Sequence, residues 1–216
     1  MIDRDEIIRA HERVQGRVRR TPILDLEAGA LCAAPVSLKL EAQQVTGSFK
    51  PRGAFNHLIA NPAPPAGVAT FSGGNHGAAL AYAATALGAP SRVFTAEFVD
   101  PVKIERMRGF GTEVDVSADF ETADKRCAEF VAETGAVYVH PYDLPHILAG
   151  QGTVGREIDE DRPDIDTLFI SVGGGGLIGG VTAWFEERIR IIAVETEGTP
   201  TLAEAMKSGP ETRITV

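Results

Sequence analysis

The stretch that decides the fold is residues 68–77, VATFSGGNHG, in which a short apolar run leads into a glycine-rich turn. The run at 68–71 predicts a buried strand, and residues 75–87 predict a helix that ends at Gly88. The same alternation extends along the chain. Strands are expected at 36–41, 68–71, 92–95, 112–116, 136–139, 168–172 and 189–195, and helices at 3–15, 51–60, 75–87, 101–108, 120–134, 146–160, 177–187 and from Pro200. Strands that alternate with helices predict an α/β fold with mostly parallel sheet.

Residues 61–67, NPAPPAG, form a proline- and alanine-rich run that is the best candidate for an internal linker. We therefore expect two lobes. The large domain would consist of residues 1–66 and 143–216, and the smaller domain would consist of residues 67–142.

The composition is that of a globular protein, with 44% hydrophobic and 24% charged residues among 216. The formal net charge of −9 disfavours a nucleic-acid backbone or an anionic membrane as a partner. The N-terminus is charged where a secretory signal needs an apolar core, and no apolar run is long enough to span a membrane. These features predict a cytoplasmic protein.

Metal and redox motifs are not apparent in the sequence. Cys32 and Cys127 belong to no C-x-x-C pair, so both are expected to be buried thiols. The five histidines show no metal-ligand spacing, and no metal site is predicted.

Residues 48–53, SFKPRG, place Lys50 between an aromatic residue and a proline suited to the first turn of a helix. An apolar wall or a second cation lowers the pKa of a lysine, because the charged form is disfavoured beside either. Phe49 and Arg52 offer these two neighbours. We interpret Lys50, just ahead of helix 51–60, as a nucleophilic amine. The alternative is a partly exposed lysine at a helix start.

The turn at 72–77, SGGNHG, directs several backbone N–H groups toward the positive end of a helix, which favours a carboxylate or phosphate ligand. The Asn75 amide can donate to an oxygen and is suited to reading a hydroxyl on a planar ring. The alternative is structural: Asn75 would cap the helix and His76 would lie on the surface.

The second turn contains four successive glycines, at 173–176, between the apolar strand 168–172 and helix 177–187. A merely tight turn needs one or two glycines, so this loop is predicted to be a phosphate nest. A rival interpretation remains open. Gly174, Gly176 and Gly179 fit the G-x-G-x-x-G dinucleotide pattern, and Glu195 follows at the spacing of a ribose-binding acid.

Together, TGSFKPRG (46–53), SGGNHG (72–77) and SVGGGGL (171–177) resemble the fold-type II family of pyridoxal-phosphate (PLP) enzymes. Within it, the similarity is closest to the threonine/serine dehydratases and serine racemases. VHP at 139–141 and GQGT at 150–153 support this. The resemblance implies a two-lobed fold like that of the tryptophan synthase β subunit, with helices on both faces of parallel sheets. It also implies PLP as cofactor, an amino-acid substrate and a homodimer.

The resemblance also implies roles for particular residues. Lys50 would form a Schiff base with PLP and remove the substrate Cα proton, and Phe49 would pack near the cofactor ring. Asn75 would hydrogen-bond the ring hydroxyl. The phosphate would be held by Gly173, Gly174, Gly175, Gly176 and Leu177, and the substrate carboxylate by the loop that contains Ser72, Gly73, Asn75 and His76.

Three departures from the family pattern qualify this expectation. Gly73 stands where serine racemases carry a second serine, which favours elimination over racemisation. Glu195 is followed by Thr199 and Thr201 rather than by a second acid, which argues against a cation site. The chain ends at Val216, whereas the family continues with strands and helices that complete the large domain, so a C-terminally incomplete fold is expected.

Three hypotheses follow. The first is a PLP-dependent lyase of amino-acid metabolism that removes water and ammonia from L-threonine or L-serine to give a 2-oxo acid. The second is a catalytically silent fragment that binds PLP or a partner. The third is a dinucleotide-binding protein that uses residues 174–179.

Overall fold

The computed structural model describes residues 2–209 and residue 212. The chain divides into two compact units, one formed by residues 1–13 and 140–216 and the other by residues 14–139. The large domain of 1–66 and 143–216 and the small domain of 67–142 remain a prediction. The two units are described in turn.

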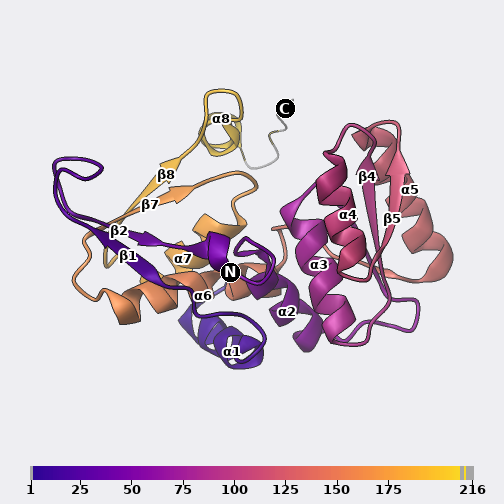
Figure 1. Ribbon diagram of the computed structural model, residues 1–216, viewed down its shortest axis with the longest axis horizontal. Coiled ribbons are helices and arrows are strands. Elements are labelled where there is room, and N and C mark those ends of the chain that lie inside the picture. Colours follow the sequence, from indigo (N-terminus) through magenta and orange to yellow (C-terminus); the bar gives the residue numbers. More distant parts are fainter. Residues whose placement is uncertain (1, 210–211, 213–216) are drawn as a thin grey trace. The chain divides into compact units, whose positions relative to one another are not determined.

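The unit of residues 14–139 is built on a four-stranded sheet in the order β5-β4-β3-β6, and every neighbouring pair is parallel. Figure 1 labels two of these strands, β4 and β5. The strands of this sheet are β3 (Val68–Phe71), β4 (Ser91–Ala96), β5 (Glu113–Ser117) and β6 (Val137–Tyr138). Helices α3 (Asn75–Ala86), α4 (Pro101–Gly109) and α5 (Phe120–Thr134) connect them. The predicted α/β class and the alternation over 68–139 are confirmed.

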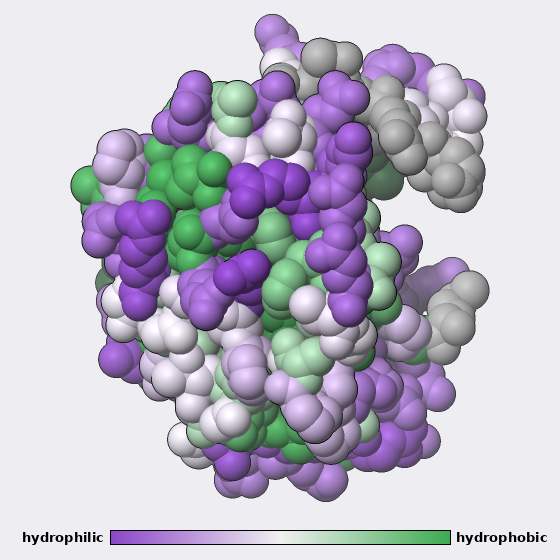
Figure 2. All heavy atoms as spheres, turned by 90° about the vertical axis from the view of Figure 1, so that its right-hand side faces the viewer, coloured by the Kyte–Doolittle hydropathy of each residue, from purple (hydrophilic) through white to green (hydrophobic). Residues whose placement is uncertain are grey.

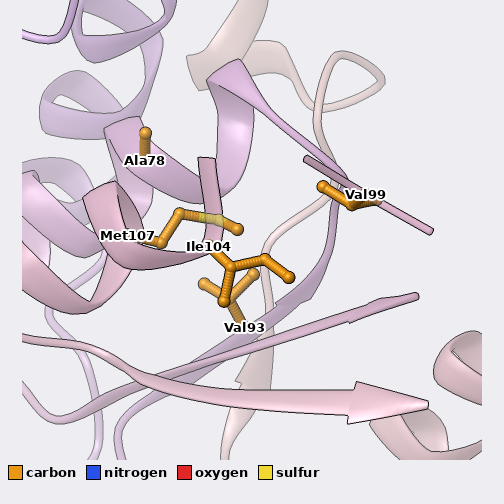
Figure 3. Packing of buried hydrophobic residues seen from close by; sticks show 5 residues of the cluster. All are labelled: Ala78, Val93, Val99, Ile104 and Met107. Atoms are coloured by element: carbon orange, nitrogen blue, oxygen red, sulfur yellow. The ribbon is translucent and has the colours of Figure 1, made fainter. Parts of the chain in front are cut away.

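Helices cover both faces of this sheet because neighbouring residues of β4 point to opposite sides. Val93 packs with Ala78 of α3 and with Ile104 and Met107 of α4 (Figure 3). Phe94 packs instead with α5, in a cluster that contains Cys127. The central strand β3, with the sequence VATF, is therefore a nearly continuous apolar run, as expected for a parallel sheet covered on both sides.

The same unit contains an antiparallel pair, β1 (Ile23–Leu26) and β2 (Val36–Lys39). A short 3-10 helix, η1 (Glu41–Gln43), and helix α2 (Lys50–Ala60) follow. The predicted strand at 36–41 thus ends early, and β1 was missed. Its four residues, ILDL, lie between Pro22 and Glu27, so the apolar pattern is too short to indicate a strand.

The unit of residues 1–13 and 140–216 contains α1 (Arg4–Val14), whose last residue lies in the other unit, α6 (Pro145–Asp161), α7 (Gly176–Phe185) and α8 (Thr201–Ser208). Its two strands, β7 (Thr167–Ser171) and β8 (Arg190–Val194), are parallel neighbours. Helices α6 and α7 approach closely at Gly152 and Gly180. All the helices and strands expected in this region are present, with boundaries shifted by one or two residues.

Side-chain caps explain several helix starts. The Asp3 carboxylate accepts a hydrogen bond from the backbone N–H of Glu6 at 2.8 Å, as expected for a capping box. Asp100 caps α4 and Asp119 caps α5 in the same manner. Helix α5 ends at Gly135, whose φ of 75° is the left-handed conformation that glycine tolerates.

The prediction that both cysteines are buried holds for one of them. Cys127 is buried as predicted, and burial raises its pKa to about 12, but Cys32 is exposed, since it lies in the irregular loop between β1 and β2. Among residues 2–209 and 212, no helix has the length and apolar character needed to cross a membrane. Figure 2 shows one face, on which hydrophilic residues and apolar patches are interspersed.

Candidate active site

Lys50 is the first residue of α2 and is partly buried. Burial lowers the pKa of its amine from 10.5 to about 8. Its Nζ lies 5.3 Å from the centre of the Phe49 ring, so the predicted apolar wall is present. A ring face by itself favours the charged amine, and burial outweighs that attraction. With this pKa about a tenth of the amine is neutral at pH 7, far more than for an ordinary lysine, which suits a nucleophile.

The predicted second perturbation, from Arg52, is wrong. The Arg52 guanidinium is fully buried and forms a two-pronged ion pair with Glu41, with Nε 2.9 Å from Oε2 and Nη2 2.8 Å from Oε1. Its charge is therefore compensated by the carboxylate, and burial alone lowers the pKa of Lys50. Arg52 instead anchors the first turn of the helix that carries Lys50.

Two hydroxyl groups near Lys50 are buried without a hydrogen-bond partner among the described residues. They belong to Thr46 and Ser48, which are 0% and 7% exposed. An unsatisfied buried hydroxyl costs about 1–3 kcal/mol, so such groups are uncommon in stable cores. Both residues lie within four positions of Lys50 in the sequence, so a polar ligand group bound at this segment would satisfy them.

The turn at 72–77 is organised by the Ser72 side chain. Its Oγ accepts hydrogen bonds from the backbone N–H groups of Gly74, at 3.2 Å, and Gly77, at 3.0 Å. Gly74 is the N-cap of α3 and supplies no side-chain cap, and Asn75 is exposed as the first helical residue. The alternative in which Asn75 caps this helix is therefore wrong.

His76 does not lie on the surface. It is 4% exposed, and its Nε2 lies 3.0 Å from the carbonyl oxygen of Val139. The ring thus joins the start of α3 to the residue that follows β6. Because the His76 side chain is buried, any contact of this residue with a substrate carboxylate would come from its backbone. That role remains a prediction.

Packing explains two glycines of this turn. A Cβ on Gly77 would lie 2.6 Å from Met107 Sδ and 3.0 Å from Val93, both in the cluster of Figure 3. A Cβ on Gly73 would lie 3.1 Å from Phe120 Cζ and from Val99. Phe120 in turn contacts Phe71 and Phe98 edge to face, so one side of the turn is aromatic.

The tetraglycine loop follows β7 and leads into α7. Its N-cap, Gly175, has a φ of 83°, which requires glycine, and has no side chain to cap the helix. A Cβ on Gly174 would overlap the ring of Tyr142, and one on Gly176 would lie 2.8 Å from Tyr142 Cβ. Apart from adjacent residues, no described atom lies within 4 Å of the corresponding position on Gly173. Packing and backbone conformation therefore explain three glycines, and the fourth faces open space.

Glu195 directly follows β8, and its carboxylate is already hydrogen-bonded within the protein rather than free to bind a ribose. Its carboxylate accepts hydrogen bonds from the backbone N–H groups of Leu202, at 2.6 Å, and Ala203, at 2.9 Å, and from Thr201 Oγ1, at 2.7 Å. These bonds, led by that from Leu202, lower the pKa of the carboxyl. The acid is thus engaged with the start of α8, which weakens the dinucleotide hypothesis.

These residues offer the donor groups that a cofactor with an aldehyde and a phosphate would need. The amine of Lys50 is suited to attack a carbonyl, and the glycine loop offers uncapped N–H groups with open space at Gly173. Among residues 2–209 and 212, no group of three or more His, Cys, Asp and Glu side chains is placed to hold a metal ion. Lys50 and the Ser72 turn lie in one compact unit, and the glycine loop lies in the other.

Comparison with known proteins agrees with this chemistry. The model of the family described as "Pyridoxal-phosphate dependent enzyme" matches residues 14–216. The chain therefore belongs to this family, has PLP as its cofactor and has the fold-type II architecture.

Three relatives illustrate the range of similar proteins. The L-threonine ammonia-lyase of Geobacter sulfurreducens is 37% identical over 96% of this chain and 53% of its own length. The β-hydroxyaspartate dehydratase of Paracoccus denitrificans is 35% identical over 95% of this chain and 67% of its own. The structure of maize serine racemase is 34% identical, with a TM-score of 0.91 over 99% of this chain and 67% of that one. The chain thus spans about half to two thirds of these relatives.

The sequence motifs predict the candidate groups of the site but do not indicate the distant residues that contact them. The Tyr142 ring lies against Gly174, and the Thr201 hydroxyl donates to the Gly173 carbonyl. Both contacts join positions far apart in the sequence, so no local pattern indicates them. The unsatisfied hydroxyls of Thr46 and Ser48 were also missed, although the motif TGSFKPRG contains both.

Proposed function

We propose that the chain belongs to a lyase that converts a hydroxy amino acid, L-threonine or L-serine, into a 2-oxo acid and ammonia. The observation that carries this proposal is the partly buried Lys50 amine, with a pKa lowered to about 8, in a chain of the PLP family. The L-threonine ammonia-lyase relative supports the reaction class.

Each part of the site has a role in this proposal. Lys50 Nζ would hold the cofactor through its aldehyde group, and the free amine would take the substrate Cα proton. The backbone of the turn that contains Ser72, Gly73, Asn75 and His76 binds the substrate carboxylate. Gly173 to Leu177 bind the cofactor phosphate, Phe49 packs against the ring, and Asn75 donates to the ring hydroxyl. Bound PLP supplies the sink for the electrons left at Cα.

The overall reaction balances without an oxidant. The Cα proton and the Cβ hydroxyl leave as water, and hydrolysis of the resulting unsaturated amine consumes one water and releases ammonia. Gly73 favours this elimination over racemisation, because position 73 carries no hydroxyl where serine racemases have a second serine.

The test is formation of 2-oxo acid from L-threonine, L-serine and 3-hydroxyaspartate by the purified chain with added PLP. We expect product from wild type and none from Lys50→Ala. Chiral analysis of residual serine measures racemisation in the same samples. Turnover that survives Lys50→Ala would overturn the assignment of the amine.

A second candidate is a silent fragment that binds PLP or a partner, because membership of the PLP family indicates the cofactor and not turnover. Solution mass and the same assay separate the two, since a stable monomer with normal turnover excludes the fragment. The homodimer and the cytoplasmic location stay predictions, and solution mass tests the first. NAD(H) binding that survives Lys50→Ala would restore the dinucleotide hypothesis.

A further inference from the structure

The start of α8 is tied to the first residue of the tetraglycine loop. Thr201 Oγ1 lies 2.6 Å from the carbonyl oxygen of Gly173 and 2.7 Å from Glu195 Oε1. Because a hydroxyl has one proton and both partners are acceptors, the proton is shared between them. These contacts link β8, α8 and the loop after β7 within one compact unit.

Glu195 fixes the Thr201 hydroxyl. Its carboxylate also accepts from the backbone N–H groups of Leu202 and Ala203, the second and third residues of α8. An acid at this end of a helix is stabilised by the helix dipole and by the otherwise unpaired N–H groups. The carboxylate therefore orients the first turn of α8, and with it the side chain of Thr201.

We propose that Thr201 is a positioning residue that orients the backbone of the tetraglycine loop for phosphate binding. The peptide between Gly173 and Gly174 is planar, so a hydrogen bond that fixes the Gly173 carbonyl also fixes the direction of the Gly174 N–H. N–H groups are the donors that a glycine loop offers to a phosphate.

The loop needs such a restraint because its glycines have no side chains that could hold the backbone in one conformation. Gly173 has no side chain, open space surrounds its Cβ position, and Gly175 adopts a positive φ. Glycine loses more conformational entropy than other residues when it is ordered, so binding a ligand would cost an unrestrained loop more entropy. Tyr142 restrains the loop at Gly174 and Gly176, and Thr201 restrains it at Gly173.

The experiment compares Thr201→Val with wild type in equilibrium titrations with PLP and with pyridoxal, which lacks the phosphate. Valine keeps the shape of threonine and removes the hydroxyl. We expect the Kd for PLP to rise about two- to fivefold, less than a full hydrogen bond because the proton is shared with Glu195, with the Kd for pyridoxal unchanged. Inorganic phosphate should compete with PLP more weakly in the variant.

Two further variants separate positioning from general damage. Thr201→Ser keeps the hydroxyl and should restore the wild-type Kd for PLP. Thr199→Val removes a hydroxyl that contacts Thr196 in the same turn, at 2.7 Å, and should bind PLP like wild type. Equal weakening toward PLP and pyridoxal, or no rescue by serine, would overturn the proposal.

The inference rests on the proposed phosphate role of the loop, and its failure is distinguishable from failure of the lyase. Wild type that binds PLP and shows the Thr201 effect without turnover would defeat the lyase proposal and support this one. Wild type that binds PLP no better than pyridoxal would overturn this inference, because the loop then contributes nothing to phosphate binding.

Discussion

The guanidinium of Arg52 and the carboxylate of Glu41 form a buried, two-pronged ion pair two residues after Lys50. Arg52 Nη2 also lies 3.2 Å from the carbonyl oxygen of Arg19, so the pair joins α2 to the segment before β1. Arg52 is 0% exposed and the Glu41 side chain is 14% exposed. Such a pair adds little net stability by itself, and loss of one partner strands a buried charge.

We therefore expect Arg52→Met to lower the free energy of unfolding by about 3–5 kcal/mol, measured by urea denaturation. The double variant Arg52→Met with Glu41→Leu should recover much of that loss, since it removes both charges. Arg108→Ala, which breaks the exposed pair with Glu105, is the control and should cost at most about 1 kcal/mol. If the double variant instead loses the sum of what Arg52→Met and Glu41→Leu lose separately, the two residues are not coupled.

The Lys50 amine should react with a carbonyl compound at lower pH than an ordinary lysine. Its pKa of about 8 predicts that the rate of reaction with pyridoxal rises with pH and levels off above pH 8. The measurement is the pH profile of the Lys50-dependent rate, with Lys50→Met as the blank. A midpoint near 10.5 would show that the amine is solvated.

The same shift predicts a pH dependence of stability. The folded pKa lies below the unfolded value, so between about pH 8 and 10.5 the unfolded chain binds more protons, and stability rises with pH in that window. Below pH 8 the buried ammonium destabilises the fold by up to about 3 kcal/mol. Lys50→Met should remove this contribution. The difference in unfolding free energy between the two proteins, measured from pH 7 to 10.5, isolates it from other titrating groups.

The sequence was informative where structure is local. Helix α5 spans residues 120–134 as predicted, and its ends have local causes, since Asp119 caps it and Gly135 follows it in the left-handed conformation. The glycine turns were recognised for the same reason. The Arg52 pairing with Glu41, the burial of His76 and the Thr201 contact to Gly173 depend on residues 11, 63 and 28 positions away. Tertiary packing decides them, and no local pattern encodes them.

Gly73 is expected to resist a side chain. A Cβ there would lie 3.1 Å from both Phe120 and Val99, closer than ordinary van der Waals contact. Gly73→Ser should lower the free energy of unfolding by about 1–3 kcal/mol. Phe120→Leu creates room, so the cost of Gly73→Ser should be smaller in that background. Equal costs in both backgrounds, measured by a double-mutant cycle, would show that Phe120 does not limit the position.

Gly180 should be the glycine of α7 that is least tolerant of substitution. A Cβ on it would overlap the carbonyl oxygen of Leu148 and lie 2.6 Å from the backbone nitrogen of Gly152, so two helix backbones would have to separate. Gly180→Ala should therefore lower the free energy of unfolding by about 2–3 kcal/mol, even though alanine favours helix by about 1 kcal/mol. Gly179→Ala is the matched control, because its Cβ would meet only the Leu148 Cδ2 atom, 2.9 Å away on a side chain that can rotate. We expect that variant to be nearly neutral in the same urea titration. If both substitutions have the same cost, the approach of α6 and α7 is not what requires glycine at position 180.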